Sequence, residues 1–399
     1  MESDVGRLLA KFESGALLRP SAAAANVVDL SRALWSAAGA QTTALSPAAE
    51  AIARRIGDPE HLVFVLVDGL GMDMLEAMPA ATFLWSHLEG TLQTVFPSTT
   101  AVALTSLATG AWPAVHGIVG HWLQLDAVGS VTVLAGTTRP EGRALADFGV
   151  TSDDLFLATA AAPTPARERL SLLPAAIVDS PFSAFAAGPW RVGYRSINDA
   201  FELAADFIKA AVRPTFTYIY ISRIDDTAHE LGSARLELVG AVRDLDASLR
   251  RLASVIGGRG RVVLTADHGH LAVRPFARRV VRGGDLATAF RAPPTGDARV
   301  VSFHLQPGTE AEFATKFRDQ VGAYFCLLTP DEIEALELLG PGALAPETKR
   351  RLGDLVAISV GDDILEFRAR GMPSDRRLAW PSHHSGLTAA EMRVPLLIV

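Results

Sequence analysis

The sequence predicts an α/β fold: a three-layer α/β/α core with a mostly parallel central sheet, plus a small α+β cap inserted into it. Short runs of consecutive apolar residues, typical of strands buried on both faces, alternate along the chain with helical segments. This alternation indicates a parallel sheet covered by helices on both sides. The chain has 399 residues, 49% of them apolar, which is enough to bury such a core.

The core strands are expected where the apolar runs are continuous. The clearest runs are His61–Val67, 216–222 and 261–265, with one more strand at 394–399. Weaker strand signals lie at 92–96, 131–135 and 175–179.

Helices are expected between these strands. Residues 1–60 form an Ala-rich helical lead-in, in which Ser46 is a good N-cap. A helix is also expected at 198–212. Segment 234–256 has apolar residues at helical spacing with charged residues between them, so it is an amphipathic helix with a solvated face.

Residues 271–380 differ from the rest of the chain. They are richer in charges and turns and contain only short strand and helix signals. We therefore expect three parts: 1–270 as the first part of the core, 271–380 as the cap, and 381–399 as the end of the core.

The overall composition excludes several classes of protein. The formal net charge of −7 argues against a general nucleic-acid-binding or anionic-membrane-binding surface. Cys326 is the single cysteine, so intrachain disulfides and cysteine-based zinc sites are excluded. The first 15 residues contain no apolar signal segment, and no apolar run is long enough to span a bilayer. A reducing, cytoplasmic location is the expectation.

One stretch, 92–110, has the layout of a nucleophile site. A strand-like run is closed by Pro97, three hydroxyl residues follow, and a helix-forming run ends at Gly110. A hydroxyl at the start of a helix lies beside unpaired N–H groups and the positive end of the helix dipole, which suits attack on an anionic phosphorus centre. An ordinary helix cap is the alternative reading. The three hydroxyl residues are Ser98, Thr99 and Thr100.

Oxygen and imidazole side chains gather at the ends of the predicted strands. Asp225 and His229 have i, i+4 spacing, so both side chains can face one ion. Such a set, without sulfur, is accepted by zinc, or by manganese or iron. Each pair alone could be an ordinary turn or surface pair. The residues concerned are Asp68, Asp225, His229, Asp267, His268 and His384; His116, His121, His270 and His383 lie near them without an assigned role.

The ordered set resembles the alkaline phosphatase superfamily and, within it, the type I phosphodiesterase/nucleotide pyrophosphatase family. The resemblance covers the core from His61 to His268 and again from His383 to the end. It implies two sets of zinc ligands and a Ser or Thr nucleophile ten residues before the glycine of a Thr-Gly pair. Counting back from Gly110 gives Thr100, with Thr99 as its neighbour. The first implied ligand set is Asp68, Asp267 and His268, and the second is Asp225, His229 and His384.

The mechanism that this resemblance implies uses two metal ions roughly 4 Å apart. The first ion would bind and activate the Thr100 oxygen, which attacks phosphorus and forms a phosphothreonine. The second would stabilise the leaving oxygen and then activate water. The implied partner is a small phosphate ester or nucleotide. Alternatives are a phosphomonoesterase or phosphonate hydrolase on the same core, or a non-catalytic binding protein.

One feature departs from the family pattern. Family members carry an Asn shortly after the His-Gly-Ile loop, where it contacts a phosphoryl oxygen; counting from Thr100 puts His121 there. His121 is therefore a candidate substrate-binding residue. A monoesterase would also need an added cation; Arg139, Arg143 and Arg223 are the sequence candidates for it.

Overall fold

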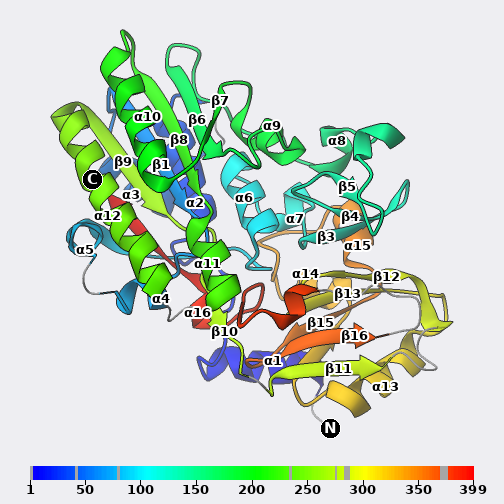
Figure 1. The fold of residues 1–399 in the computed structure, drawn as a ribbon. Coiled ribbons are helices and arrows are strands. Elements are labelled where there is room, and N and C mark those ends of the chain that lie inside the picture. Colours follow the sequence, from blue (N-terminus) through cyan, green and yellow to red (C-terminus); the bar gives the residue numbers. More distant parts are fainter. Residues whose placement is uncertain are drawn as a thin grey trace.

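The computed structural model describes residues 3–40, 44–78, 81–232, 236–274, 276–282, 288–368 and 376–399. Within them the chain forms two seven-stranded sheets, called here the main sheet and the second sheet. Figure 1 shows the second sheet at the lower right of the main sheet, on the side where the N-terminus lies.

The main sheet has the strand order β2-β18-β9-β1-β8-β6-β7. The five strands from β9 to β7 run parallel, whereas β18 is antiparallel to both β9 and β2. β1 is buried along its whole length, as expected for a central strand covered on both faces. The strands are β1 (His61–Val67), β2 (Leu88–Gln93), β6 (Glu168–Pro174), β7 (Arg191–Tyr194), β8 (Thr215–Ile221), β9 (Gly260–Thr265) and β18 (Arg393–Ile398).

Helices cover the main sheet on both faces. α10 (Ile197–Ala210) and α12 (Leu236–Ile256) pack together in front of the sheet in Figure 1. The group of α2 (Val27–Ala37), α3 (Pro47–Ile56) and α6 (Thr100–Thr109) lies behind it. Ser46 caps α3 by accepting a hydrogen bond from the Ala49 N–H, as its sequence predicts.

The second sheet has the strand order β14-β15-β13-β12-β3-β4-β5, and its paired strands are antiparallel. It has an apolar core of its own, in which Phe303 of the sheet packs against Phe313 and Phe317 of α13 (Glu310–Val321). Its strands are β3 (Trp122–Leu125), β4 (Gly129–Thr132), β5 (Thr137–Thr138), β12 (Phe290–Gly296), β13 (Val300–Leu305), β14 (Phe325–Leu328) and β15 (Leu355–Ser359).

Two strand pairs and several short helices complete the described structure. The pairs are β10 (Leu271–Ala272) with β17 (Ser382–His383), and β11 (Arg278–Arg282) with β16 (Ile364–Arg368). The α-helices are α1 (Asp4–Glu13), α4 (Met72–Glu76), α5 (Thr82–Ser86), α7 (Pro113–His116), α8 (Ser152–Leu155), α9 (Pro181–Ala187), α11 (Arg223–Leu231), α14 (Pro330–Ala335), α15 (Pro346–Leu352) and α16 (Ala389–Met392). The 3₁₀ turns are η1 (Leu145–Phe148), η2 (Gly257–Arg259) and η4 (Arg376–Ala379).

The three-layer core and its mostly parallel sheet confirm the predicted fold class. The strand predicted at 175–179 is wrong: that segment follows β6 as a turn, and the strand lies earlier, at Glu168–Pro174. The start of the predicted 234–256 helix falls on residues 234–235, outside the described residues. The second sheet contains strands from both sides of the predicted boundary at residue 271. The division into 1–270, 271–380 and 381–399 stays a prediction.

Candidate active site

The predicted ligand residues meet at one edge of the main sheet. Asp68, Asp225 and Asp267 follow the carboxyl ends of β1, β8 and β9, which are neighbouring parallel strands. His384 lies before β18, and because that strand is antiparallel, its beginning lies at the same edge. Parallel strands end together, so side chains far apart in the sequence converge here.

A first cluster consists of Asp68, Asp267 and His268, all buried. The Nε2 atom of His268 lies 3.3 Å from Asp68 Oδ1 and 3.5 Å from Asp267 Oδ2. The other oxygen of each carboxylate is occupied: Tyr220 donates its hydroxyl to Asp68 Oδ2, and the Gly69 and His268 N–H groups donate to Asp267 Oδ1. Asp68 Oδ1 and Asp267 Oδ2 are buried without a hydrogen-bond partner. Burial and the carboxylates of Asp267 and Asp225 raise the pKa of Asp68.

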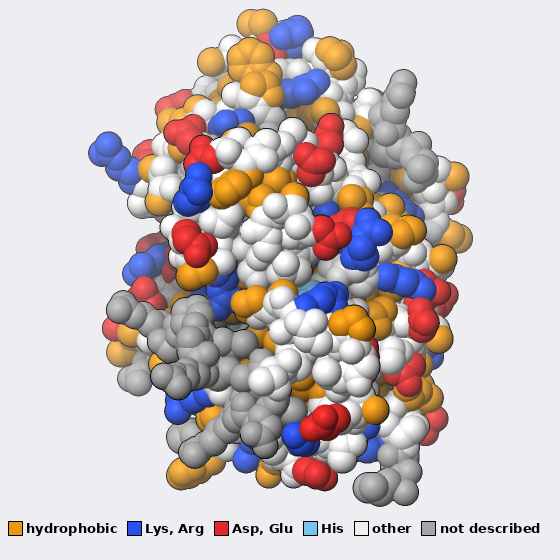
Figure 2. Space-filling view, turned by 90° about the vertical axis from the view of Figure 1, so that its right-hand side faces the viewer, with side chains coloured by type: hydrophobic (Ala, Val, Ile, Leu, Met, Phe, Trp, Pro, Cys, Tyr) orange, Lys and Arg blue, Asp and Glu red, His pale blue; other side chains and the backbone are white. Residues whose placement is uncertain are grey.

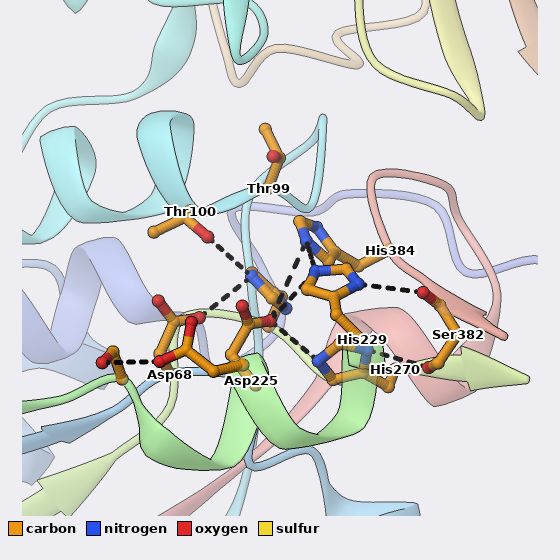
Figure 3. A network of polar contacts seen from close by, with 12 residues as sticks. Asp68, Thr99, Thr100, Asp225, His229, His270, Ser382 and His384 are labelled. Atoms are coloured by element: carbon orange, nitrogen blue, oxygen red, sulfur yellow. Dashed lines mark hydrogen bonds and ion pairs between the residues drawn. The ribbon is translucent and has the colours of Figure 1, made fainter. Parts of the chain in front are cut away.

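A second cluster consists of Asp225, His229 and His384. Asp225 and His229 lie one turn apart on α11, and Asp225 Oδ1 is 3.4 Å from His229 Nε2 and 4.0 Å from His384 Nε2. The two imidazole Nε2 atoms are 3.1 Å apart. Figure 3 shows both rings directed toward Asp225.

The imidazole tautomers indicate that these clusters fit cations. The Nδ1 atoms of His229, His268 and His384 contact the carbonyl oxygens of Ser382, Gly269 and Ser98, at 2.9, 3.0 and 3.1 Å. A carbonyl oxygen can only accept, so each Nδ1 carries the hydrogen, and a ring that is neutral then presents an Nε2 lone pair. Burial lowers the pKa of His229 to about 4 and that of His384 well below its usual value, so these two rings are neutral near pH 7.

Those lone pairs face other electron-rich atoms. His229 and His384 direct theirs at each other. In the first cluster, the unpartnered oxygens of Asp68 and Asp267 lie together beside His268 Nε2. Such groups repel one another unless a cation lies between them. Oxygen and neutral imidazole ligands with fixed Nδ1–H groups are the donor set that zinc and related ions accept.

His270 joins the second cluster, although the sequence analysis left it without a role. Its Nε2 lies 2.8 Å from Asp225 Oδ1 and its Nδ1 lies 2.9 Å from Ser382 Oγ. Figure 3 shows this chain of contacts from Ser382 through His270 to Asp225. Its position two residues after His268 was the one signal in the sequence that could have suggested it.

Thr100 is the hydroxyl residue that faces the clusters. It is the first residue of α6, and its Oγ1 lies 3.1 Å from His268 Nε2. Thr99 is the N-cap residue and lies further from the clusters in Figure 3. Its hydroxyl makes a weak 3.5 Å contact with Asp297 Oδ1. Ser98 donates its hydroxyl to the Gly386 carbonyl and is thereby occupied.

Asp297 is a second residue that the sequence did not single out. It lies in the turn between β12 and β13, and its Oδ2 accepts a 3.0 Å hydrogen bond from the His121 N–H. Burial raises the pKa of Asp297 to about 6, against the opposing effect of Arg377. Burial, with Arg377 and Arg139, lowers the pKa of His121 to about 3, so its ring is neutral. Nothing in the local sequence marks Asp297, because a tertiary contact brings it to the site.

A cleft with a volume of about 930 Å³, within the size range of small-molecule sites, is lined by residues of both clusters and by Thr100. Thr100, Asp68 and His384 lie on its core side, α9 contributes apolar residues, and the 271–380 segment contributes Asp297, Arg377 and Trp380. His121 also lines it. The cleft therefore joins the two clusters to a wall made from the predicted cap.

A sequence model of the type I phosphodiesterase/nucleotide pyrophosphatase family matches residues 62–364. The chain belongs to this family. Membership indicates a hydrolase of phosphate esters, and the Asp and His clusters of the site are candidate metal-binding groups. A search of curated protein sequences found no match.

Solved structures share the family fold with this chain. Murine ectonucleotide pyrophosphatase/phosphodiesterase 5, an inactive variant in complex with AMP, is 16% identical, with a TM-score of 0.59 over 84% of this chain and 87% of that chain. Phosphonoacetate hydrolase from Sinorhizobium meliloti 1021, in complex with phosphonoformate, is 18% identical, with a TM-score of 0.60 over 85% of this chain and 90% of that chain. The alkaline-phosphatase-like fold expected for this family member is thereby confirmed.

Two further observations concern the helices and the surface charge of this phosphodiesterase-family chain. None of its described helices is both long and apolar enough to cross a membrane. On the face drawn in Figure 2, acidic and basic side chains are interspersed, and neither kind forms a continuous patch.

Proposed function

We propose that the chain is a two-metal phosphodiesterase or nucleotide pyrophosphatase with Thr100 as its nucleophile. The observation that carries this proposal is the 3.1 Å contact between Thr100 Oγ1 and His268 Nε2 at the start of α6. This contact puts the Thr100 hydroxyl beside the carboxylate–imidazole clusters and at the positive end of a helix. The neighbouring hydroxyls of Ser98 and Thr99 do not have this position.

Six side chains would hold the two ions. Asp68, Asp267 and His268 form the first set, to which the Thr100 oxygen adds a ligand. Asp225, His229 and His384 form the second set. Zinc suits these ligands best, with manganese or iron as alternatives. When bound, such ions supply positive charge for the phosphoryl oxygens and for the entering and leaving oxygens.

The residues of the chain would act as follows. Thr100 Oγ1 would lose its proton to solvent and attack phosphorus, and the bond from phosphorus to the leaving oxygen would break. The leaving group would depart as an alcohol from a phosphate diester, after protonation, or as a phosphate from a pyrophosphate. Water then cleaves the resulting phosphothreonine and restores the hydroxyl. The first N–H groups of α6 and the neutral ring of His121 are the donors available for a non-bridging oxygen.

A phosphomonoesterase or phosphonate hydrolase is the second candidate. The observation that favours it is Arg377 in the cleft wall, since a dianionic substrate needs an added cation. The fold shared with phosphonoacetate hydrolase is compatible with it.

Two measurements test the proposal. The zinc-loaded protein should hydrolyse bis-p-nitrophenyl phosphate in preference to p-nitrophenyl phosphate; the opposite preference would favour the second candidate. Thr100→Ala should lose activity by about 10³-fold or more while keeping its metal content. Full activity in that variant would move the nucleophile to Thr99 or to water. A wild-type protein that holds both ions yet hydrolyses neither ester would support a binding protein instead.

A further inference from the structure

The indole of Trp122 lies between two guanidinium groups. The Cζ atom of Arg139 is 3.3 Å from the ring centroid, and that of Arg377 is 3.8 Å from it. Two guanidinium groups cannot both come this close on one face of a ring, so they flank it. Trp122 is the first residue of β3, directly after His121, whereas Arg377 belongs to η4 in the predicted cap. Stacking of this kind holds the plane of a guanidinium in place.

We propose that Arg377, held against Trp122, binds a second anionic group of the substrate. The inference rests on the proposed function and narrows its substrate class to phosphate esters, pyrophosphates or phosphonates that carry a further phosphate or carboxylate. Both groups share the chemistry that a guanidinium recognises: two oxygens matched to a planar fork of N–H donors.

The charges of the cleft support a binding role for Arg377. Among the described residues that line the cleft, Arg377 is the single Arg or Lys. Five acidic residues line the same cavity: Asp68, Asp225, Asp226, Glu230 and Asp297. Two of these carboxylates belong to the metal clusters, so bound ions offset their charge. Arg377 is then the fixed cation of the cleft wall, where part of the substrate beyond the reacting phosphorus would lie.

The position of Arg377 relative to the nucleophile follows from its neighbours. It stacks on Trp122, next to His121, whose N–H donates to Asp297 Oδ2. Asp297 in turn contacts Thr99, the residue before the proposed nucleophile. Arg377 is thus close to the reacting end of the cleft without belonging to either metal cluster. The cleft volume of about 930 Å³ accommodates a substrate that spans the two.

A purely structural reading is that Arg377 only offsets the buried charge of Asp297. The two readings differ in what a substitution changes. If Arg377 only offsets the charge of Asp297, removing its side chain lowers kcat/KM equally for all substrates. Adding Asp297→Asn then restores kcat/KM. If it binds the substrate, its loss is selective for substrates with a second anion.

The kinetic test compares two substrate classes on the zinc-loaded protein. ATP carries further phosphates, phosphonoacetate carries a carboxylate, and bis-p-nitrophenyl phosphate carries neither. In Arg377→Met, the ratio of kcat/KM for ATP or phosphonoacetate to that for bis-p-nitrophenyl phosphate should fall about 10- to 100-fold, mainly through KM, because a charge-assisted hydrogen-bond pair is lost. Arg377→Lys should recover part of the ratio. A loss of kcat/KM confined to ATP would identify a phosphate as the second anionic group. A loss confined to phosphonoacetate would identify a carboxylate.

Arg139→Met is the matched control, since Arg139 lies on the other face of Trp122 and is not among the residues that line the cleft. In Arg139→Met the same ratio of kcat/KM values should change less than about threefold. An unchanged ratio in Arg377→Met, or equal losses in both variants, would overturn the proposal. So would a wild-type protein that cleaves only bis-p-nitrophenyl phosphate.

A binding measurement separates this inference from the proposed function. Zinc-loaded Thr100→Ala should bind pyrophosphate about tenfold more tightly than does the Thr100→Ala/Arg377→Met double variant, whereas both should bind methyl phosphate alike. This comparison needs no turnover, so it holds even if the protein cleaves none of these esters. Equal pyrophosphate affinities would refute the role of Arg377 and leave the proposed function untouched.

Discussion

Arg299 and Glu391 form an ion pair in which both side chains are completely buried, with Nε and Oε1 2.6 Å apart. Arg299 lies in the turn between β12 and β13 of the second sheet, and Glu391 lies in α16, just before β18 of the main sheet. Glu391 Oε1 also accepts a hydrogen bond from the Gly386 N–H, two residues after His384. A Cβ atom on Gly386 would come within 2.7 Å of Arg299 Nε, so only glycine fits there. One ion pair therefore joins the two sheets and holds the segment that carries His384.

Arg299→Met should destabilise the protein by about 3–5 kcal/mol, because it leaves the Glu391 carboxylate buried and unpaired. Urea unfolding of the purified variants measures this change. Lys316→Met is the control: Lys316 pairs with Glu312, but their side chains are 37% and 70% exposed, so the cost should stay below about 0.5 kcal/mol. Equal destabilisation of the two variants would contradict a special role for the buried pair.

His384→Ala should reduce the metal content from about two ions per chain to about one, since the first cluster keeps all its ligands. Elemental analysis of protein dialysed against zinc gives the stoichiometry. His87→Ala, outside the cleft, should retain both ions.

Chelation of both ions should lower the melting temperature of the wild type, because the carboxylates of Asp68 and Asp267 are left buried and close together. A melting temperature unaffected by chelator would count against metal binding at these clusters.

His270→Ala should weaken the second metal site while leaving its ligands in place. His270 links Asp225 to Ser382, and loss of such an orienting contact costs about 10- to 100-fold in metal affinity. Competition with a coloured zinc chelator measures the affinity of each site. Ser382→Ala should have a smaller effect in the same direction. If His270→Ala bound the second ion as tightly as the wild type, the contact would have no orienting role.

Asp297→Asn should remove a pH-dependent loss of stability. The folded carboxyl has a pKa of about 6, above its usual value of 3.8, so between these values the folded state holds a proton that the unfolded state has released. The wild type therefore loses stability as the pH rises from about 4 to about 6, by roughly 3 kcal/mol from this group. Asp297→Asn lacks this loss, so its stability relative to the wild type should increase over that range.

Denaturant midpoints of both proteins at several pH values test this prediction, and their difference cancels the titration of the other groups. A constant difference from pH 4 to pH 7 would show that Asp297 titrates normally in the folded protein.

Local sequence patterns determined much of the site. Continuous apolar runs marked β1, β8 and β9, and the acidic residues directly after them were recognisable because a parallel sheet presents its strand ends at one edge. The resemblance to the family, counted from Gly110, favoured Thr100 over Thr99, and in the structure Thr100 is the one that contacts His268. The strand predicted at 175–179 was misplaced, because a short apolar stretch does not reveal where its pairing begins.

Only the tertiary structure decided what surrounds that edge. The sequence by itself determined the fold class, the ligand candidates and the hydroxyl segment, since each depends on residues close together in the chain. Asp297 and Arg377 reach the cleft through the second sheet and the segments around it, and the buried Arg299–Glu391 pair joins that sheet to the main sheet. Strands β3 to β5 join the second sheet from the other side of residue 271. Pairing between distant strands and burial of charge depend on long-range packing. Such packing leaves no periodic signal in the local sequence.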